Sequence, residues 1–144
     1  MSDFLDVLAH DAKETVDSGY YQKLKPAASV YASLRKAILQ CKTNPVITEI
    51  KAASPSIGTI RRNFKPSEVA KAMEKGGAVG ISVLTEPKHF NGSLQALTEA
   101  RGAVKLPILM KDIILNPIQV EAASQIGADA ILLIEALFER GYSK

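Results

Sequence analysis

The sequence predicts an α/β fold: the N-terminal half of a TIM (β/α)8 barrel, about four βα units, preceded by an extra N-terminal helical segment. Four short runs rich in Ile, Leu and Val occupy residues 46–50, 80–84, 107–110 and 130–134. Their starts lie 34, 27 and 23 residues apart, which leaves room for one helix after each run. Each run has the length and composition of a strand buried on both faces of a parallel sheet. We therefore expect a helical extension at residues 1–43 and a partial barrel, strands 1–4, at residues 44–144.

The helical extension is expected to contain two helices. In the first, apolar side chains recur at helical spacing and Gly19 closes the pattern. The second is expected to begin with an N-cap at Ser29 and to end near Cys41. The apolar positions of the two helices are Phe4, Leu5, Leu8, Ala12 and Val16, then Val30, Leu34, Ala37 and Ile38.

Local signals mark the helices between the strands. Pro66 is typical of a first helical turn, and Gly76-Gly77 marks the end of that helix. Ser93 can cap the next helix, and Asn116-Pro117 with Gln119 forms a pattern like a capping box for the third. Residues 135–140 would begin a fourth helix.

Four βα units do not close an eight-stranded barrel, which takes about 250 residues. A doubly wound sheet is the competing architecture, but it would normally carry phosphate-binding glycines in its first strand-to-helix turn. Neither that fingerprint nor a P-loop is present in the sequence. The barrel interpretation is therefore preferred.

Composition excludes several classes of protein. No apolar run approaches the roughly 18 residues of a membrane span, and residues 1–19 carry five acids and one lysine, unlike a signal peptide. We therefore expect a cytoplasmic protein that does not contact a membrane. Cys41 is the only cysteine, and His10 and His89 are the only histidines, so no metal cofactor is expected.

Charge is distributed unevenly along the chain. Residues 1–22 carry five acids and one base, whereas residues 23–75 carry eleven bases and three acids. The basic segment could bind an anionic small molecule or a nucleic acid, or it could simply form a surface exposed to solvent. Its bases are not interleaved with the aromatic residues that single-strand binders use, so we expect no nucleic-acid partner.

In a βα barrel the active site lies at the carboxyl ends of the strands, and these ends are ionic in this sequence. Glu49 and Lys51 are two residues apart on an extended segment, so their side chains point to the same face. They form either part of a site or a surface ion pair of little energetic value.

Lys111 is the stronger signal, because uncharged residues surround the Lys111-Asp112 pair on both sides. Enclosure in apolar surroundings would favour the neutral amine and suit Lys111 to proton transfer. The alternative is a lysine that extends to solvent beside Asp112.

Two loops complete the candidate site. Residues 54–58 supply hydroxyls from Ser54 and Ser56 and backbone donors, with Arg61 and Arg62 behind them, and could hold a carboxylate or a phosphate. Serines beside a proline are also common in plain turns. Phe90 could form an aromatic wall after the second strand or pack against its own helix.

Five motifs together resemble the indole-3-glycerol-phosphate synthases, in order and in spacing. They are Ile-Thr-Glu-Ile-Lys-Ala-Ala-Ser-Pro-Ser at 47–56, Ser-Val-Leu-Thr-Glu at 82–86, Phe-Asn-Gly-Ser at 90–93, Leu-Met-Lys-Asp at 109–112 and Gly-Ala-Asp-Ala-Ile-Leu-Leu-Ile at 127–134. The acidic helical leader is similar to the segment that this family places across one end of its barrel.

The resemblance implies ring closure of 1-(2-carboxyphenylamino)-1-deoxyribulose 5-phosphate, an anionic phosphorylated substrate, with loss of carbon dioxide and water and without a cofactor. Lys111 would be the general acid that protonates the ketone oxygen. Lys51 would hold the substrate carboxylate and assist dehydration, with Glu49 as its partner. The substrate-binding residues implied by the match are Ser54, Ser56, Leu84, Phe90 and Leu132.

Two departures from the family pattern matter. Ile113 stands where the family usually has phenylalanine, and the catalytic glutamate, asparagine and phosphate loops of strands five to eight are absent from the sequence. We therefore expect the chain alone to be inactive and to self-associate or to join a C-terminal half-barrel partner. The alternative is a non-catalytic half-barrel that serves as a binding or assembly module.

Overall fold

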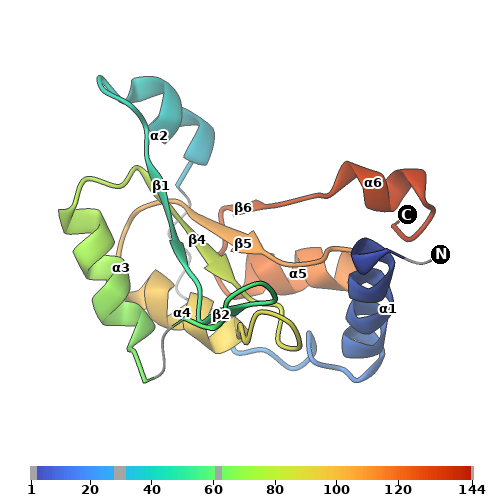
Figure 1. Ribbon diagram of the computed structural model, residues 1–144. Helices are drawn as coiled ribbons and strands as arrows, with labels where there is room; N and C mark the ends of the chain where they lie inside the picture. The colour runs from blue at the N-terminus through green and yellow to red at the C-terminus, as the bar shows by residue number, and fades with distance from the viewer. Residues whose placement is uncertain (1–2, 28–31, 61–62, 144) are drawn as a thin grey trace.

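The computed structural model describes residues 3–27, 32–60 and 63–143, and its centre is a four-stranded parallel sheet. The strands are β1 (Ile47–Ile50), β4 (Gly80–Leu84), β5 (Ile108–Lys111) and β6 (Ala130–Ile131), in the order β1-β4-β5-β6. Helices α3 (Pro66–Lys75), α4 (Leu94–Ala103), α5 (Pro117–Gln125) and α6 (Glu135–Glu139) follow the strands in turn. The chain is thus an α/β fold with a parallel sheet, consistent with a partial barrel (Figure 1).

Three of the predicted helix starts, at Pro66, Ser93 and Asn116, are confirmed. Pro66 is in the first turn of α3, and the Ser93 hydroxyl accepts the N–H of Ala96 at 3.0 Å. Asn116 and Gln119 form a reciprocal capping box at the start of α5. These caps satisfy N–H groups that have no partner within the helix.

The helical extension differs from the prediction in its second part. Helix α1 (Phe4–Asp17) matches it, with Gly19 at a positive φ of 80° after the helix end. Helix α2 (Leu34–Gln40) begins later than expected, because Ser33 caps it. The predicted cap Ser29 lies outside the described residues, as do Arg61 and Arg62.

Two further differences concern strands. The predicted strand at 130–134 is only Ala130–Ile131 in the structure, since Ile134 already serves as the N-cap of α6. A short antiparallel hairpin, β2 (Ala53–Ser54) and β3 (Gly58–Thr59), follows β1 and was not predicted. Gly58 has a φ of 72°, a conformation that glycine adopts without strain.

Apolar side chains form two clusters. In the first, α3, α4 and α5 cover one face of the sheet through residues such as Met73, Leu97 and Ala122, packed with Val83 and Met110. The opposite face, which we call the open face, carries the polar side chains of Glu49, Ser82 and Lys111.

The second cluster lies beneath α1. Leu8 and Ala12 pack with Ile113, which follows β5, and with Leu137 of α6. Helix α1 therefore lies across the carboxyl ends of the strands, beside the C-terminal segment in Figure 1. None of the helices in the described parts of the chain is long and apolar enough to cross a membrane.

Candidate functional site

The open face brings the three charged residues singled out in the sequence into one contact group. Strand register places Glu49 beside Ser82, and Leu84 beside Lys111. Side chains two apart on a strand share a face, so these residues line one surface near the strand ends. We call Glu49, Lys51 and Lys111 the ionic triad.

Glu49 is the centre of the ionic triad. Lys111 Nζ lies 2.8 Å from Glu49 Oε2, and Lys51 Nζ lies 3.2 Å from Glu49 Oε1. The Ser82 hydroxyl donates to Glu49 Oε2 at 3.3 Å. Partial burial raises the pKa of Glu49, but the hydrogen bonds from Lys111 and Lys51 outweigh this effect and leave its pKa below the usual value. An ionised carboxylate therefore lies between two ammonium groups.

Lys111 is more exposed than its apolar neighbours in the sequence suggested. The fraction of its side chain exposed to solvent is 39%. In β5, the side chains of Ile108 and Met110 face the helices, whereas that of Lys111 faces the open side and meets Glu49. The expectation of an apolar enclosure was wrong, because strand alternation separates Lys111 from those neighbours.

Ser54 and Ser56 belong to the hairpin that follows β1. The Ser54 hydroxyl lies 3.4 Å from that of Ser56 and accepts the N–H of Ile57 at 3.3 Å. Ser54 is buried, whereas Ser56 is exposed. The hairpin thus turns back on itself and presents Ser56 at the end of the sheet that carries the ionic triad.

The three apolar residues assigned to a substrate pocket lie in different surroundings. Leu84 is buried and lines a cleft of about 330 Å³ with Ile50 and Phe64. Phe90 packs into the cluster beneath α1. Leu132 follows β6 and is 38% exposed.

Ile113, the departure from the family pattern, is buried in the cluster beneath α1. Its N–H bonds the preceding carboxylate of Asp112 at 2.8 Å. In this position it contributes to the docking of α1, the same cluster that holds Phe90.

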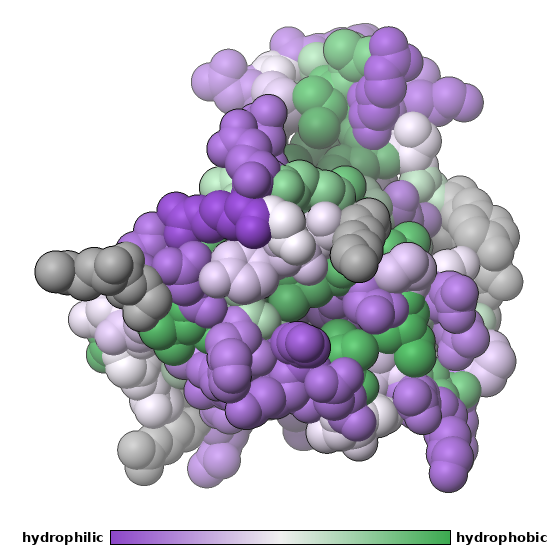
Figure 2. All heavy atoms as spheres, turned by 90° about the vertical axis from the view of Figure 1, so that its right-hand side faces the viewer, coloured by the Kyte–Doolittle hydropathy of each residue, from purple (hydrophilic) through white to green (hydrophobic). Residues whose placement is uncertain are grey.

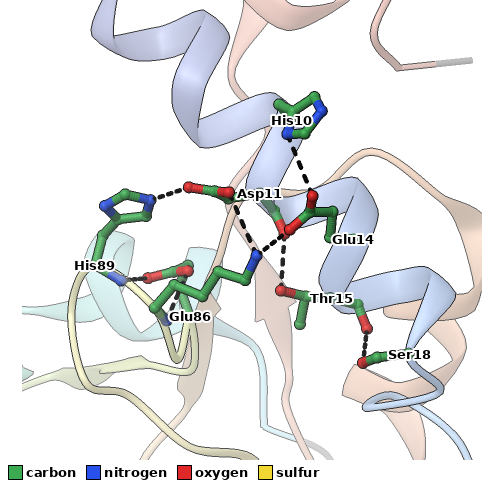
Figure 3. Close-up of polar contacts among 8 residues, drawn as sticks. His10, Asp11, Glu14, Thr15, Ser18, Glu86 and His89 are labelled. Atoms are coloured by element: carbon green, nitrogen blue, oxygen red, sulfur yellow. Dashed lines mark hydrogen bonds and ion pairs between the residues drawn. The ribbon is translucent and has the colours of Figure 1, made fainter.

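A polar network that the sequence did not reveal fixes α1 to the loop after β4 (Figure 3). Lys88 Nζ lies 2.6 Å from Glu14 and 3.3 Å from Asp11, and His89 Nε2 lies 2.6 Å from Asp11 Oδ2. The hydrogen bond with His89 is the main cause of a lowered pKa at Asp11. Within the loop, the buried Glu86 carboxylate accepts the N–H groups of Lys88, His89 and Phe90.

Among the described residues, one group has donor atoms close enough to consider for a metal ion: His10, Asp11 and Glu14. The Lys88 ammonium already occupies the space beside Asp11 and Glu14. We therefore describe this group as an ion-pair cluster that docks α1.

A buried polar cluster around Asp112 was also not predicted from the sequence. The Asp112 carboxylate is 2% exposed and accepts the hydroxyls of Tyr21 and Thr85. The sequence alone predicts Asp112 only as a neighbour of a solvent-exposed Lys111. The signal available in the sequence was the pair of tyrosines, Tyr20 and Tyr21, directly after the first helix.

Comparisons with known proteins agree with the motifs. A family model described as "Indole-3-glycerol phosphate synthase" matches residues 6–144. Proteins named indole-3-glycerol phosphate synthase are 52% identical over 103 residues in Prochlorococcus marinus (strain MIT 9515), covering 71% of this chain and 35% of the relative. In Neisseria gonorrhoeae (strain NCCP11945) the identity is 53% over 96 residues, covering 67% and 37%. In Priestia megaterium it is 48% over 109 residues, covering 72% and 43%. The chain thus spans about two fifths of the length of these relatives.

Proposed function

Because this chain belongs to the indole-3-glycerol phosphate synthase family, we propose that its ionic triad takes part in the indole-forming ring closure. The substrate would be 1-(2-carboxyphenylamino)-1-deoxyribulose 5-phosphate, and the products indole-3-glycerol phosphate, carbon dioxide and water. The observation that carries the proposal is that Lys51 and Lys111 share the carboxylate of Glu49 at 3.2 and 2.8 Å.

The chemistry needs a proton donor at the ketone oxygen and a cation for the substrate carboxylate. We assign the first role to Lys111 and the second to Lys51. Lys51 comes from the segment after β1 and Lys111 from the end of β5, so two separate ammonium groups face one region. Glu49 holds both in the absence of substrate, and a substrate carboxylate can replace it on Lys51.

The pocket follows from the same placement. Ser54 and Ser56 would donate to an anionic group, while Leu84 and Leu132 would contact the aromatic ring from the open face. Phe90 would shape the wall from its place beneath α1. We propose no metal ion and no cofactor, because acid–base groups suffice for a condensation with loss of carbon dioxide and water.

We further propose that the chain corresponds to strands 1–4 of a (β/α)8 barrel. The parallel order β1-β4-β5-β6, the helix after each strand and the share of the relatives that is covered support this extent. As described, the sheet ends at β1 and β6, and both edges could accept a further strand. A second half-barrel or a second copy of the chain would then complete the molecule.

A binding or assembly module without catalysis is the second candidate. It is favoured by a groove of about 380 Å³ beside β6, lined by apolar side chains that include Val120, Leu133 and Phe138. On the side of the molecule turned toward the viewer in Figure 2, hydrophobic side chains lie in hollows between hydrophilic ones. Such patches are typical of interaction surfaces.

A hybrid protein separates the two candidates. The chain would be joined to the remaining C-terminal part of the Neisseria gonorrhoeae relative, and product formation followed by the fluorescence of indole-glycerol phosphate. We expect the hybrid to turn over substrate and Lys111→Ala to lower kcat by about 10²–10⁴-fold with KM within a few fold, because proton donation acts in the transition state.

Lys105→Ala is the matched control, since this exposed lysine lies just before β5, at its opposite end. It should leave kcat unchanged. Near-normal turnover in Lys111→Ala would exclude Lys111 as the acid. The unmodified chain alone should give no product, and an active monomer would contradict the half-barrel proposal.

A further inference from the structure

Asp112 is a buried carboxylate that the proposed reaction does not use. It directly follows Lys111, yet its side chain points to the opposite side of β5, away from the ionic triad, because successive side chains on a strand alternate. Only 2% of Asp112 is exposed to solvent. A carboxylate is costly to bury unless hydrogen bonds satisfy it, so its partners indicate what it is for.

Three donors satisfy this carboxylate, and each comes from a different part of the chain. Thr85, after β4, donates its hydroxyl to Asp112 Oδ2 at 2.5 Å. Tyr21, after α1, donates to the same oxygen at 3.0 Å. Asp112 Oδ1 accepts the N–H of Ile113 at 2.8 Å. The carboxylate thus joins the helical extension to the ends of two neighbouring strands.

The same group of residues also holds the backbone of Lys111. The N–H of Thr85 donates to the carbonyl oxygen of Lys111 at 3.0 Å. Tyr20 adds a second tie, since its hydroxyl donates to the carbonyl oxygen of Thr85 and accepts the N–H of Leu94, each at 3.2 Å. The carbonyl group of Lys111 is therefore held by Thr85, and Thr85 is held in turn by Tyr20.

We propose that Asp112 is a positioning residue, which fixes the end of β5 to Tyr21 and Thr85 so that the Lys111 ammonium stays against Glu49. Its catalytic consequence rests on the proposed function, but the contact between Lys111 and Glu49 does not. A side chain as long as lysine keeps one contact only when its backbone is held, because each freed rotatable bond adds conformational entropy.

The protonation state of Asp112 agrees with this role. Burial raises the pKa of Asp112 to about 6, against hydrogen bonds from Thr85, Ile113 and Tyr21 that lower it. The group is therefore ionised at neutral pH, and an ionised carboxylate can accept all three donors at once.

The test uses the titration of Glu49, followed by the ¹³Cδ resonance of the labelled 144-residue chain. The contact with Lys111 helps to hold the pKa of Glu49 below its usual value. Lys111→Met removes that contact, so we expect this variant to show the largest rise in the midpoint of the Glu49 titration. We expect Asp112→Ala to give at least half of that rise, and Tyr21→Phe a smaller rise in the same direction.

Asp129→Asn is the structural control. Asp129 is also a buried carboxylate, but its Oδ2 accepts the N–H of Ile108 at the start of β5, far from Lys111 along the strand. This variant should lower stability and leave the Glu49 midpoint unchanged. If Asp112 had a purely structural role, Asp112→Ala would likewise lower stability and leave the Glu49 midpoint unchanged.

An unchanged Glu49 midpoint in folded Asp112→Ala would overturn the proposal. If that variant does not fold, an unchanged midpoint in both Tyr21→Phe and Thr85→Val would do so. A Lys111→Met variant without a rise would also overturn it, because the contact would then be absent in solution. None of these readings needs catalysis, so failure of the proposed function would show separately, as an inactive hybrid protein.

Discussion

Burial affects the carboxylates of Glu49 and Asp112 differently. Glu49 has two ammonium partners, whose hydrogen bonds outweigh its partial burial and lower its pKa. Asp112 has only neutral donors, and its burial raises its pKa to about 6. The partners of Glu49 therefore stabilise its negative charge, whereas the negative charge of Asp112 lowers the stability of the fold.

Asp112→Asn should therefore change how stability depends on pH. The pKa of Asp112 rises from 3.8 to about 6 on folding, so between these values the folded protein binds more protons than the unfolded chain. The contribution of this group to the free energy of unfolding falls as pH rises through that window. Urea unfolding should show the variant gaining about 2 kcal/mol relative to the parent between pH 4 and pH 7. A constant difference between the two proteins at both pH values would contradict this.

The contact of Glu49 with Lys51 could be predicted from the sequence, and that with Lys111 in part. Alternation along one strand brings Glu49 and Lys51 together, and parallel strands bring their carboxyl ends to one edge. The contact of Tyr21 with Asp112 joins residues 91 apart in the chain. No local pattern encodes such a contact, because it depends on how the leader packs on the finished sheet.

Among elements, the helix starts predicted at Pro66, Ser93 and Asn116 were confirmed, whereas α2 begins later than the start predicted at Ser29. Ser93 and Asn116 cap α4 and α5, as expected from their own side chains. The hairpin β2–β3 consists of two-residue strands, which are too short to show an alternating pattern. Helix α2 contains no buried residue. Its packing therefore imposes no apolar pattern that could mark the residue at which it begins.

One ion pair joins three elements and should dominate their stability. Arg101 of α4 and Asp129 form a salt bridge of 2.8 Å in which each side chain is 1% exposed. Asp129 also accepts the N–H of Ala32 at 2.7 Å and that of Ile108 at 2.9 Å. The leader, α4 and β5 therefore meet at a single carboxylate.

Asp129→Ala should lower the free energy of unfolding by about 3–5 kcal/mol, because it leaves the buried Arg101 guanidinium without a counter-charge. Chemical denaturation with matched m values would measure the loss. Glu68→Ala is the control, since the pair Lys65–Glu68 is 75% and 69% exposed and should change stability by less than about 0.5 kcal/mol. A loss at Asp129 no larger than that at Glu68 would show that the junction does not hold these elements together.

For the molecule as a whole, the exposed apolar surface beside β6 is the main feature. Leu133 is 51% exposed and Phe138 is 42% exposed, and both line the groove next to this edge of the sheet. Strand edges and apolar grooves of this kind favour association.

We expect the isolated chain to form a dimer or a larger oligomer in light scattering at micromolar concentration. The double variant Leu133→Lys and Phe138→Glu should shift it toward the monomer, because charges in the groove oppose burial. Leu39→Lys is the matched control: Leu39 is 66% exposed on α2 and should leave the mass unchanged. A parent chain that is monomeric at all concentrations would contradict the proposal of an incomplete barrel.

The contacts of α1 also have a consequence for the order of folding. Helix α1 is the first element of the described chain, but its polar partners lie far along the sequence: Lys88 is 74 residues from Glu14, and Arg140 is 137 residues from Asp3. Contacts that close such long loops form late, since the loss of chain entropy precedes any gain. Until then only the capping box of Asp3 and Asp6 stabilises the start of the helix. We expect α1 to dock last, so that the cover over the strand ends closes only on a sheet that has already formed.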